Sequence, residues 1–327
     1  MDVSTSTDAG LPTMMLPAYL VGYNEGWFGG NYGTDLTSNF DLTYVDKTLD
    51  GIVGAGGHVV RIFLFEAAQG ITWNMSGSPP QTQGVSPTFL THLDTVLSAA
   101  RARGLWVYLT ALNSYDAYKD PPQYVSYFKD MYSNVGGELD AYETLVLAPT
   151  LAILDAHQDN LYGFDLINEI EGANNNGVFP DTFNAPRAFL KNMRDSVRTR
   201  SPWLKVTATA GWGNPAPDIS SGFFSGLGLD FYDLHEYSDS GQYTGATAAC
   251  ARAQQDGVPI VLGEYGQSTA SEDDTIQYNA TAEFLSNSQS LGFKAAIGWR
   301  YDAAEANLNF MRVDGSQRPA VALVKLY

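Results

Sequence analysis

Eight short apolar runs, distributed along the whole chain, constrain the fold more than any other feature of this sequence. They occupy residues 19–23, 58–65, 105–111, 161–167, 205–210, 231–235, 260–264 and 293–299. Most of them are apolar at consecutive positions, which is typical of strands covered on both faces in a parallel sheet. The sequence therefore predicts eight buried parallel strands.

Helical patterns separate these runs. The clearest begins at Ser86-Pro87, a capping residue followed by proline at the first helical position, and it ends at Gly104. Others cover residues 44–53, 139–156, 186–198, 246–255, 275–290 and 319–326. Eight predicted strands that largely alternate with seven helical patterns indicate the α/β class, and they favour a single closed (β/α)8 TIM barrel over an open sheet. We expect this barrel domain to span residues 18–327, after an N-terminal tail of residues 1–17.

Composition and charge narrow the classes of function. Hydrophobic residues make up 44% of the 327 residues and charged residues 17%, which suits a packed core. The formal net charge of −18 disfavours nucleic acid and anionic membranes as partners, because both require a basic surface. A neutral ligand is unaffected by this charge. No glycine-rich phosphate loop follows the first predicted strand, so a nucleotide cofactor is not expected.

Cysteine use and apolar run length add further limits. Cys250 is the single cysteine, which excludes an internal disulfide and a cysteine-based zinc cluster. The sequence contains no run of about 18 apolar residues, the length that a membrane-spanning helix needs. The first basic residue is Lys47, so no signal peptide is visible. We expect a monomer without cofactor or metal that is secreted after removal of its leader, with a cytoplasmic location as the open alternative.

Two of the predicted strands stop on a glutamate. The run from Gly163 ends in Asn168-Glu169, and the run from Ile260 ends on Glu264. A carboxylate at the exit of a buried strand is costly to desolvate unless the protein uses it there. Two carboxylates on different strands are the minimum for cleaving a glycosidic bond, one as acid/base and one as nucleophile or second base. We therefore take both as candidate catalytic residues, and expect nearby Glu171 to be solvated.

Further polar and aromatic residues lie where the other predicted strands end, which is where a barrel of this type places its active site. These candidate binding residues are Arg61, Asn113, Asn168, Trp212, His235, Tyr237 and Trp299. Arg61 lies among apolar residues and needs a partner there. A role beside the catalytic residues and a structural ion pair with Asp165 or Glu66 both stay open.

The ordered set Arg61, Asn168-Glu169, His235, Tyr237, Glu264 and Trp299 resembles the retaining β-glycosidases of clan A, and most of all glycoside hydrolase family 5. The resemblance extends from the second predicted strand to the eighth. It implies that Glu169 is the acid/base and Glu264 the nucleophile. It also implies the supporting roles: Asn168 meets the sugar 2-hydroxyl, Arg61 and Tyr237 hold Glu264, His235 lines the site, and Trp299 floors the subsite of the attacked sugar.

One departure from the family pattern bears on the substrate. Many family 5 cellulases carry a histidine near the end of the third strand, where this chain has Thr110-Ala111-Leu112-Asn113. In this respect, and over residues 113–118, the chain is more similar to the family's β-mannanases. The resemblance thus implies a retaining endo-β-1,4-glycanase acting on a neutral oligo- or polysaccharide, with mannan or glucomannan favoured and β-1,4-glucan close behind. An exo-acting β-glycosidase of the same clan and a non-catalytic carbohydrate-binding barrel are the alternatives.

Segments outside the predicted strands and helices could form a substrate cleft. We expect residues 69–86 and 113–136 to be long loops that wall a cleft several sugars long. Five aromatic residues could serve as outer sugar platforms or could simply lie in the core or on the surface, and the sequence does not decide between these roles: Trp27, Trp73, Tyr115, Tyr118 and Trp212.

Overall fold

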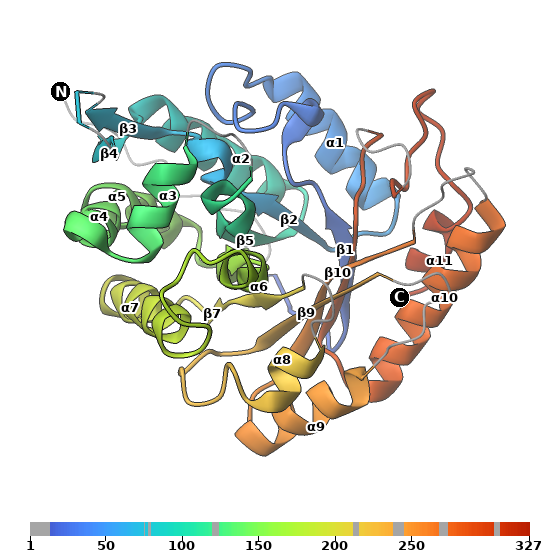
Figure 1. Cartoon of the computed structure of the whole chain (residues 1–327). Coiled ribbons are helices and arrows are strands. Elements are labelled where there is room, and N and C mark those ends of the chain that lie inside the picture. Colours follow the sequence, from blue (N-terminus) through green and yellow to red (C-terminus); the bar gives the residue numbers. More distant parts are fainter. Residues whose placement is uncertain are drawn as a thin grey trace.

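The computed structural model describes residues 14–74, 76–77, 80–119, 124–211, 216–237, 245–267, 274–303 and 308–327. Within these residues, nine strands form one parallel sheet in the order β7-β6-β5-β2-β1-β11-β10-β9-β8, and helices surround it (Figure 1). The edge strands β7 (Val206–Thr207) and β8 (Thr209–Ala210) are two halves of one extended segment, interrupted at Ala208. Because β7 and β8 stand at the two ends of the strand order, this shared segment brings the ends of the sheet together. The sheet is a nearly closed barrel of eight strand positions, and the predicted TIM-type fold is confirmed.

The other barrel strands lie where the apolar runs predict them, within a few residues at each end. They are β1 (Leu20–Asn24), β2 (Val59–Phe63), β5 (Trp106–Asn113), β6 (Leu161–Asn168), β9 (Tyr232–Tyr237), β10 (Ile260–Gly266) and β11 (Ala295–Gly298).

Most helices also follow the predicted patterns. They are α1 (Leu42–Gly54), α2 (Pro87–Ala102), α4 (Glu138–Tyr142), α5 (Ala148–Leu154), α7 (Asn184–Arg200), α9 (Ala246–Asp256), α10 (Asp274–Leu291) and α11 (Val321–Val324). A π-helical turn, Glu143–Leu147, joins α4 to α5, so the predicted helix over 139–156 is continuous but irregular. The side chain of Ser86 caps α2 by accepting from the N–H of Phe89 at 3.5 Å. The last helix is only four residues long, shorter than predicted.

The two segments expected to be loops carry secondary structure instead. Strands β3 (Ile71–Asn74) and β4 (Gln81–Val85) form an antiparallel hairpin, and α3 (Val125–Tyr132) follows the end of β5. Trp73 of the hairpin stacks on Tyr127 of α3, with ring centroids 4.5 Å apart. This contact gives Trp73 a packing role and holds the two additions together. Short helices α6 (Ile170–Asn175) and α8 (Ala216–Ser221) were also not predicted.

Alternation along the strands separates the two faces of the sheet. One face packs against the helices in the main hydrophobic core. The other face fills the barrel, where Val59, Tyr108 and Phe231 belong to a second apolar cluster. Two residues beyond Val59 lies Arg61, and two residues beyond Phe231 lies Asp233. The inside of the barrel therefore changes from apolar to polar toward the carboxyl ends of the strands. No helix in the described part of the chain is long and apolar enough to cross a membrane.

Candidate active site

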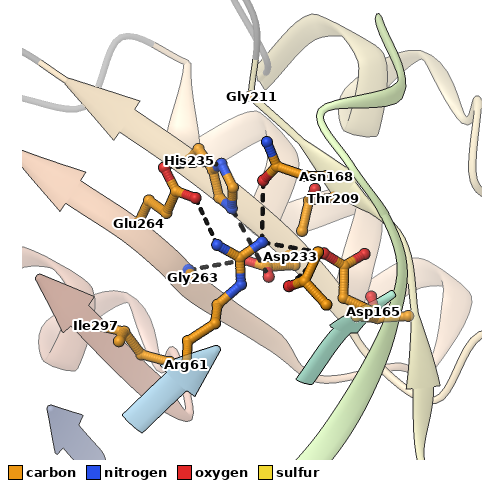
Figure 2. Close-up of polar contacts among 12 residues, drawn as sticks. Arg61, Asp165, Asn168, Thr209, Gly211, Asp233, His235, Gly263, Glu264 and Ile297 are labelled. Atoms are coloured by element: carbon orange, nitrogen blue, oxygen red, sulfur yellow. Dashed lines mark hydrogen bonds and ion pairs between the residues drawn. The ribbon is translucent and has the colours of Figure 1, made fainter. Parts of the chain in front are cut away.

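Arg61 of β2 lies at the centre of the polar layer and is fully buried. Its Nη1 donates to Oε1 of Glu264 at 2.5 Å and to Oδ1 of Asn24 at 3.1 Å. Its Nη2 donates to Oδ2 of Asp165 and to Oδ1 of Asn168, both at 3.0 Å (Figure 2). Both sequence interpretations of Arg61 therefore describe real contacts: it meets Glu264 and it forms a buried ion pair with Asp165. Two carboxylates compensate the guanidinium charge, which a buried arginine requires.

Glu264 of β10 reaches the barrel interior because the strand register shifts beside it. Gly263 faces inward, since a Cβ there would collide with the carboxyl group of Asp233. Regular alternation would then turn Glu264 outward. The pairing of β10 with β9 shifts between Leu262 and Glu264, and this places Glu264 opposite His235. Irregularities of this kind next to active sites re-aim a side chain.

The second oxygen of Glu264 is held as firmly as the first. The hydroxyl of Tyr237, at the end of β9, donates to Oε2 of Glu264 at 2.5 Å. Arg61 and Tyr237 thus bind one carboxyl oxygen each, and the side chain of Glu264 has a single favoured orientation.

Glu169 follows β6 in a left-handed backbone conformation, with φ of 50° and ψ of 57°. Few residues other than glycine adopt this conformation, and those that do concentrate at functional sites. The N–H of Glu169 donates to Oγ1 of Thr209 at 2.7 Å, and the Thr209 hydroxyl donates to the carbonyl of Ile167 at 3.1 Å. Strand β8 therefore fixes the turn that directs Glu169 into the barrel mouth.

Three residues surround the carboxyl group of Glu169. The hydroxyl of Tyr115 donates to its Oε2 at 3.2 Å, and Nδ1 of His235 lies 3.1 Å from its Oε1. Gly211 provides the space, because a Cβ there would lie 2.5 Å from Oε1 of Glu169. Nδ1 of His235 also lies 3.5 Å from Oε2 of Glu264, so the imidazole bridges the two glutamates.

The two carboxyl groups face each other across a short gap. An oxygen of Glu169, an oxygen of Glu264 and a ring nitrogen of His235 all lie within 4.8 Å of one another. Retaining glycosidases hold their carboxyl groups about 5–5.5 Å apart, whereas inverting ones need about 6.5–9.5 Å to admit a water molecule. The observed gap is closer to the retaining spacing.

The family model described as cellulase (glycosyl hydrolase family 5) matches residues 43–305. The chain belongs to glycosyl hydrolase family 5. The matched region contains Arg61, both glutamates and Trp299, and family membership makes this protein a glycoside hydrolase. No curated protein matches its sequence.

Solved structures of several mannanases share the fold of this family 5 enzyme. The β-1,4-mannanase from the sea hare Aplysia kurodai superposes with a TM-score of 0.69 at 18% identity, over 94% of this chain and 91% of that one. The β-mannanase from the blue mussel Mytilus edulis gives 0.69 at 18% identity, over 94% and 90%. The endo-1,4-β-mannanase from Rhizomucor miehei gives 0.68 at 17% identity, over 94% and 92%. At these identities the likeness establishes the barrel fold.

Burial raises the pKa of both glutamates of the family 5 enzyme, but their surroundings oppose this effect differently. Burial raises the pKa of Glu169 to about 7, although the hydrogen bond from Tyr115 and the charge of Arg61 both lower it. Burial also raises the pKa of Glu264. The Arg61 guanidinium and the Tyr237 hydroxyl, which both contact its carboxyl group, lower this pKa. Because the cation pairs directly with Glu264, we take Glu264 to ionise at lower pH than Glu169.

The imidazole of His235 is neutral in this site. Burial lowers the pKa of His235 to about 3, and the ring has no exposed surface. Because carboxyl oxygens face Nδ1, the tautomer with hydrogen on Nδ1 fits the contacts. His235 therefore donates a hydrogen bond toward the carboxyl pair and does not titrate at neutral pH.

Glu169, His235 and Glu264 also form a group whose ligand atoms are close enough to hold a metal ion. Their neighbours do not suit one. The Arg61 guanidinium contacts one oxygen of Glu264 and the Tyr237 hydroxyl contacts the other. A cation bound there would face the positive charge of Arg61. The group is better suited to proton transfer and nucleophilic attack, and the absence of a metal or cofactor stays a prediction.

Two further predicted site residues, Trp299 and Asn113, lie beside this centre. Trp299 follows β11 and is 8% exposed, and its ring packs edge-on against Trp27 and Phe63 with centroids 6.0 Å away in both cases. Asn113 ends β5, and its Oδ1 lies 3.4 Å from Nδ2 of Asn168. Trp212 lies outside the described residues. The sugar contacts expected of these residues stay predictions.

The structure also brings residues into the site that sequence analysis did not select for it. Tyr108 donates to Oδ2 of Asp233 at 2.5 Å, and burial raises the pKa of this carboxyl to about 8. A period-of-two pattern ending at His235 could have identified Asp233 as facing inward. For Tyr115 the sequence leaves open a sugar platform or a structural role, and neither includes the contact that its hydroxyl makes with Glu169.

One expectation near the site is wrong. Glu171 is buried, at 5% exposure, and its Oε2 accepts from the N–H of Gly211 at 3.3 Å. The cause is the left-handed turn at Glu169, after which α6 begins at once. This turn directs Glu171 toward Gly211 and away from solvent.

Proposed function

We propose that this family 5 enzyme is a retaining endo-β-1,4-glycanase that prefers mannan or glucomannan to β-1,4-glucan. The observation that carries the retaining mechanism is the pair of Glu169 and Glu264, with carboxyl oxygens within 4.8 Å of each other. The substrate preference is supported by the mannanases from Aplysia kurodai and Rhizomucor miehei, whose structures share the fold over 94% of this chain.

In the first step, the ionised Glu264 attacks the anomeric carbon and forms a covalent glycosyl-enzyme. Arg61 and Tyr237 orient the attacking carboxylate through its two held oxygens. Glu169 is protonated below its pKa of about 7 and donates its proton to the leaving oxygen.

In the second step, Glu169 has lost its proton and acts as the base for an incoming water molecule. This water attacks the same carbon and releases Glu264, so two inversions restore the β-configuration. The neutral Nδ1–H of His235 can donate to whichever carboxylate carries the charge, because it lies 3.1 Å from Glu169 and 3.5 Å from Glu264. Charge moves between the glutamates while the imidazole stays in place.

An exo-acting enzyme is the second candidate. A solved exo-β-1,4-mannosidase from an Opitutaceae bacterium shares the fold with a TM-score of 0.67 at 16% identity, over 94% of this chain and 58% of that one. The paired glutamates serve either mode of action equally well. They argue against a purely carbohydrate-binding barrel, because binding requires no second carboxylate held by Arg61.

A substrate screen tests the proposal. Purified protein is assayed on mannan, glucomannan, carboxymethyl-cellulose, xylan and aryl β-glycosides, with viscosity and reducing ends followed together. We expect mannan and glucomannan to be cut fastest, with an early fall in viscosity and oligosaccharide products, and NMR should show the β-anomer first. Release of monosaccharide alone at constant viscosity would identify the exo-acting enzyme. An initial α-anomer would refute retention.

A further inference from the structure

A directional chain of hydrogen bonds leads from Arg61 away from Glu264. Arg61 can only donate, so the amide oxygen of Asn168 faces it, at 3.0 Å. The Nδ2 of Asn168 then points to Oδ1 of Asn113 at 3.4 Å. The Nδ2 of Asn113 in turn donates to Oε1 of Glu66. The chain therefore runs through two amides, from a cation to a carboxyl group that lies just past the end of β2.

The backbone around Glu66 is held in place. Ala67 and Ala68 both adopt left-handed conformations, with φ of 52° and 59°. Strain of this kind persists only where the surroundings impose it. Here the N–H of Ala67 donates to both oxygens of the buried Asp116, at 3.1 and 3.3 Å. Glu66 itself is 4% exposed, so its acceptor oxygen is fixed relative to Asn113.

The acceptor on Glu66 determines which way the amide of Asn113 points. An asparagine amide can rotate by 180° and exchange its oxygen and nitrogen with little change in shape. In Asn113 this rotation would place its NH₂ group against two donors, the Nδ2 of Asn168 and the N–H of Tyr115, which donates to Oδ1 at 3.3 Å. It would also place the amide oxygen against an oxygen of Glu66. Glu66 thus favours the orientation that accepts from Asn168.

We propose that Glu66 is a positioning residue, which acts through Asn113 to hold Asn168 with an N–H directed toward the sugar 2-hydroxyl. This inference rests on the proposed function, together with the family resemblance, which implies that contact for Asn168. The amide oxygen of Asn168 accepts from Arg61, and one of its two N–H groups faces Asn113. The other N–H is left for the substrate. Contacts to the 2-hydroxyl strengthen in the transition state, so misplacing Asn168 lowers kcat more than it raises KM.

Two variants at position 66 separate the acceptor from the charge. Glu66→Gln keeps an acceptor oxygen without a charge, and Glu66→Met keeps the length but has no acceptor. We expect Glu66→Gln to stay within about 3-fold of wild type, and Glu66→Met to lose roughly 30-fold in kcat with KM within about 3-fold, since it leaves a buried donor unpaired. The matched control is Glu138→Met. Glu138 is 6% exposed and accepts from the N–H of Thr82 at 3.2 Å, so its loss should lower the melting temperature and leave kcat within about 3-fold.

A double-mutant cycle distinguishes positioning from a general structural effect. Asn168→Ala already removes the contact to the 2-hydroxyl, so adding Glu66→Met to it should cost less than about 3-fold more. If Glu66→Met does not fold, Asn113→Ala breaks the same chain one link nearer the site and takes its place in the cycle.

The outcomes are separable from those of the substrate screen. Losses that multiply in the double mutant, a Glu66→Met enzyme with wild-type kcat, or a Glu66→Gln enzyme as impaired as Glu66→Met would each overturn the positioning role while the proposed function stands. A wild-type protein that cleaves no β-glycoside would overturn the proposed function, and the positioning role with it.

Discussion

Gly211 lies against Glu169 so closely that a Cβ at position 211 would be 2.5 Å from Oε1 of Glu169 and 2.7 Å from its Cγ. The backbone at Gly211 cannot easily retreat, because its N–H donates to the buried carboxyl group of Glu171. The missing side chain at position 211 thus creates the space in which the proposed acid/base stands.

Replacing Gly211 by alanine tests this relationship. The added methyl group must displace the end of the Glu169 side chain, which is flexible, so the fold should survive while the proton donor moves. We expect Gly211→Ala to reduce kcat by about 10²-fold, the cost of a displacement near 1 Å at a reacting group, with little change in melting temperature. Gly54→Ala is the control, since a Cβ there would meet nothing within 4 Å. Equal activity of the two variants would show that Glu169 does not depend on this space.

The hydroxyl of Tyr237 should set the acidic limb of the pH profile. It donates to Glu264 and lowers the pKa of that carboxyl against the raising effect of burial. In Tyr237→Phe this pKa rises, so the ionised nucleophile is lost at higher pH than in wild type. We expect the acidic limb of kcat/KM to move to higher pH and kcat/KM at its optimum to fall about 10-fold or more. An unchanged acidic limb would assign that limb to another group.

The hydroxyl of Tyr115 should act on the opposite limb. It donates to Oε2 of Glu169 and lowers the pKa of that carboxyl, which is about 7 in the wild-type protein. In Tyr115→Phe the pKa rises, and Glu169 keeps its proton to higher pH. The basic limb of kcat/KM should therefore extend toward alkaline pH while the acidic limb stays in place. A shift of both limbs together would mean that the two tyrosines act on one shared group.

Burial of Glu169 should also make stability depend on pH. Its pKa is about 7 when folded, against a reference value of 4.5, so between these values the folded protein keeps a proton that the unfolded chain has released. The free energy of unfolding must then fall as pH rises through this window. Glu169→Gln cannot release that proton. In urea unfolding, its stability relative to wild type should be higher at pH 7.5 than at pH 4.5, and a difference independent of pH would contradict the raised pKa.

The order of the polar strand ends could be predicted from sequence because each apolar run stops at a recognisable residue. The runs before Glu169 and Glu264 are long enough to be strands, and parallel strands in a barrel bring their carboxyl ends to one rim. The contacts of Arg61 with Glu264 and Asp165 follow from the same logic, since a buried guanidinium needs carboxylates.

The direction of individual side chains could not be predicted, because it depends on local irregularities of the backbone. Regular alternation turns Glu264 away from the barrel interior, and only the register shift beside Leu262 brings it in. The left-handed turn at Glu169 leaves no mark in the sequence, and it is the reason that Glu171 is buried. The β3–β4 hairpin packs on α3 through Trp73 and Tyr127, two residues far apart in the chain, and no local pattern indicates such a contact.

The most direct test of the two-glutamate mechanism is to trap its covalent intermediate. The reagent is a 2-deoxy-2-fluoro β-glycosyl fluoride of the sugar that the substrate screen selects. It reacts with the nucleophile to form a glycosyl-enzyme, and water hydrolyses this intermediate only slowly. Mass spectrometry of the digested protein should then find one fluorosugar on the peptide that contains Glu264, at its carboxyl group. The Glu264→Gln variant should carry none. A fluorosugar on Glu169, or no adduct from a protein that cleaves its substrate with an α-anomer as first product, would contradict the assignment of Glu264 as nucleophile.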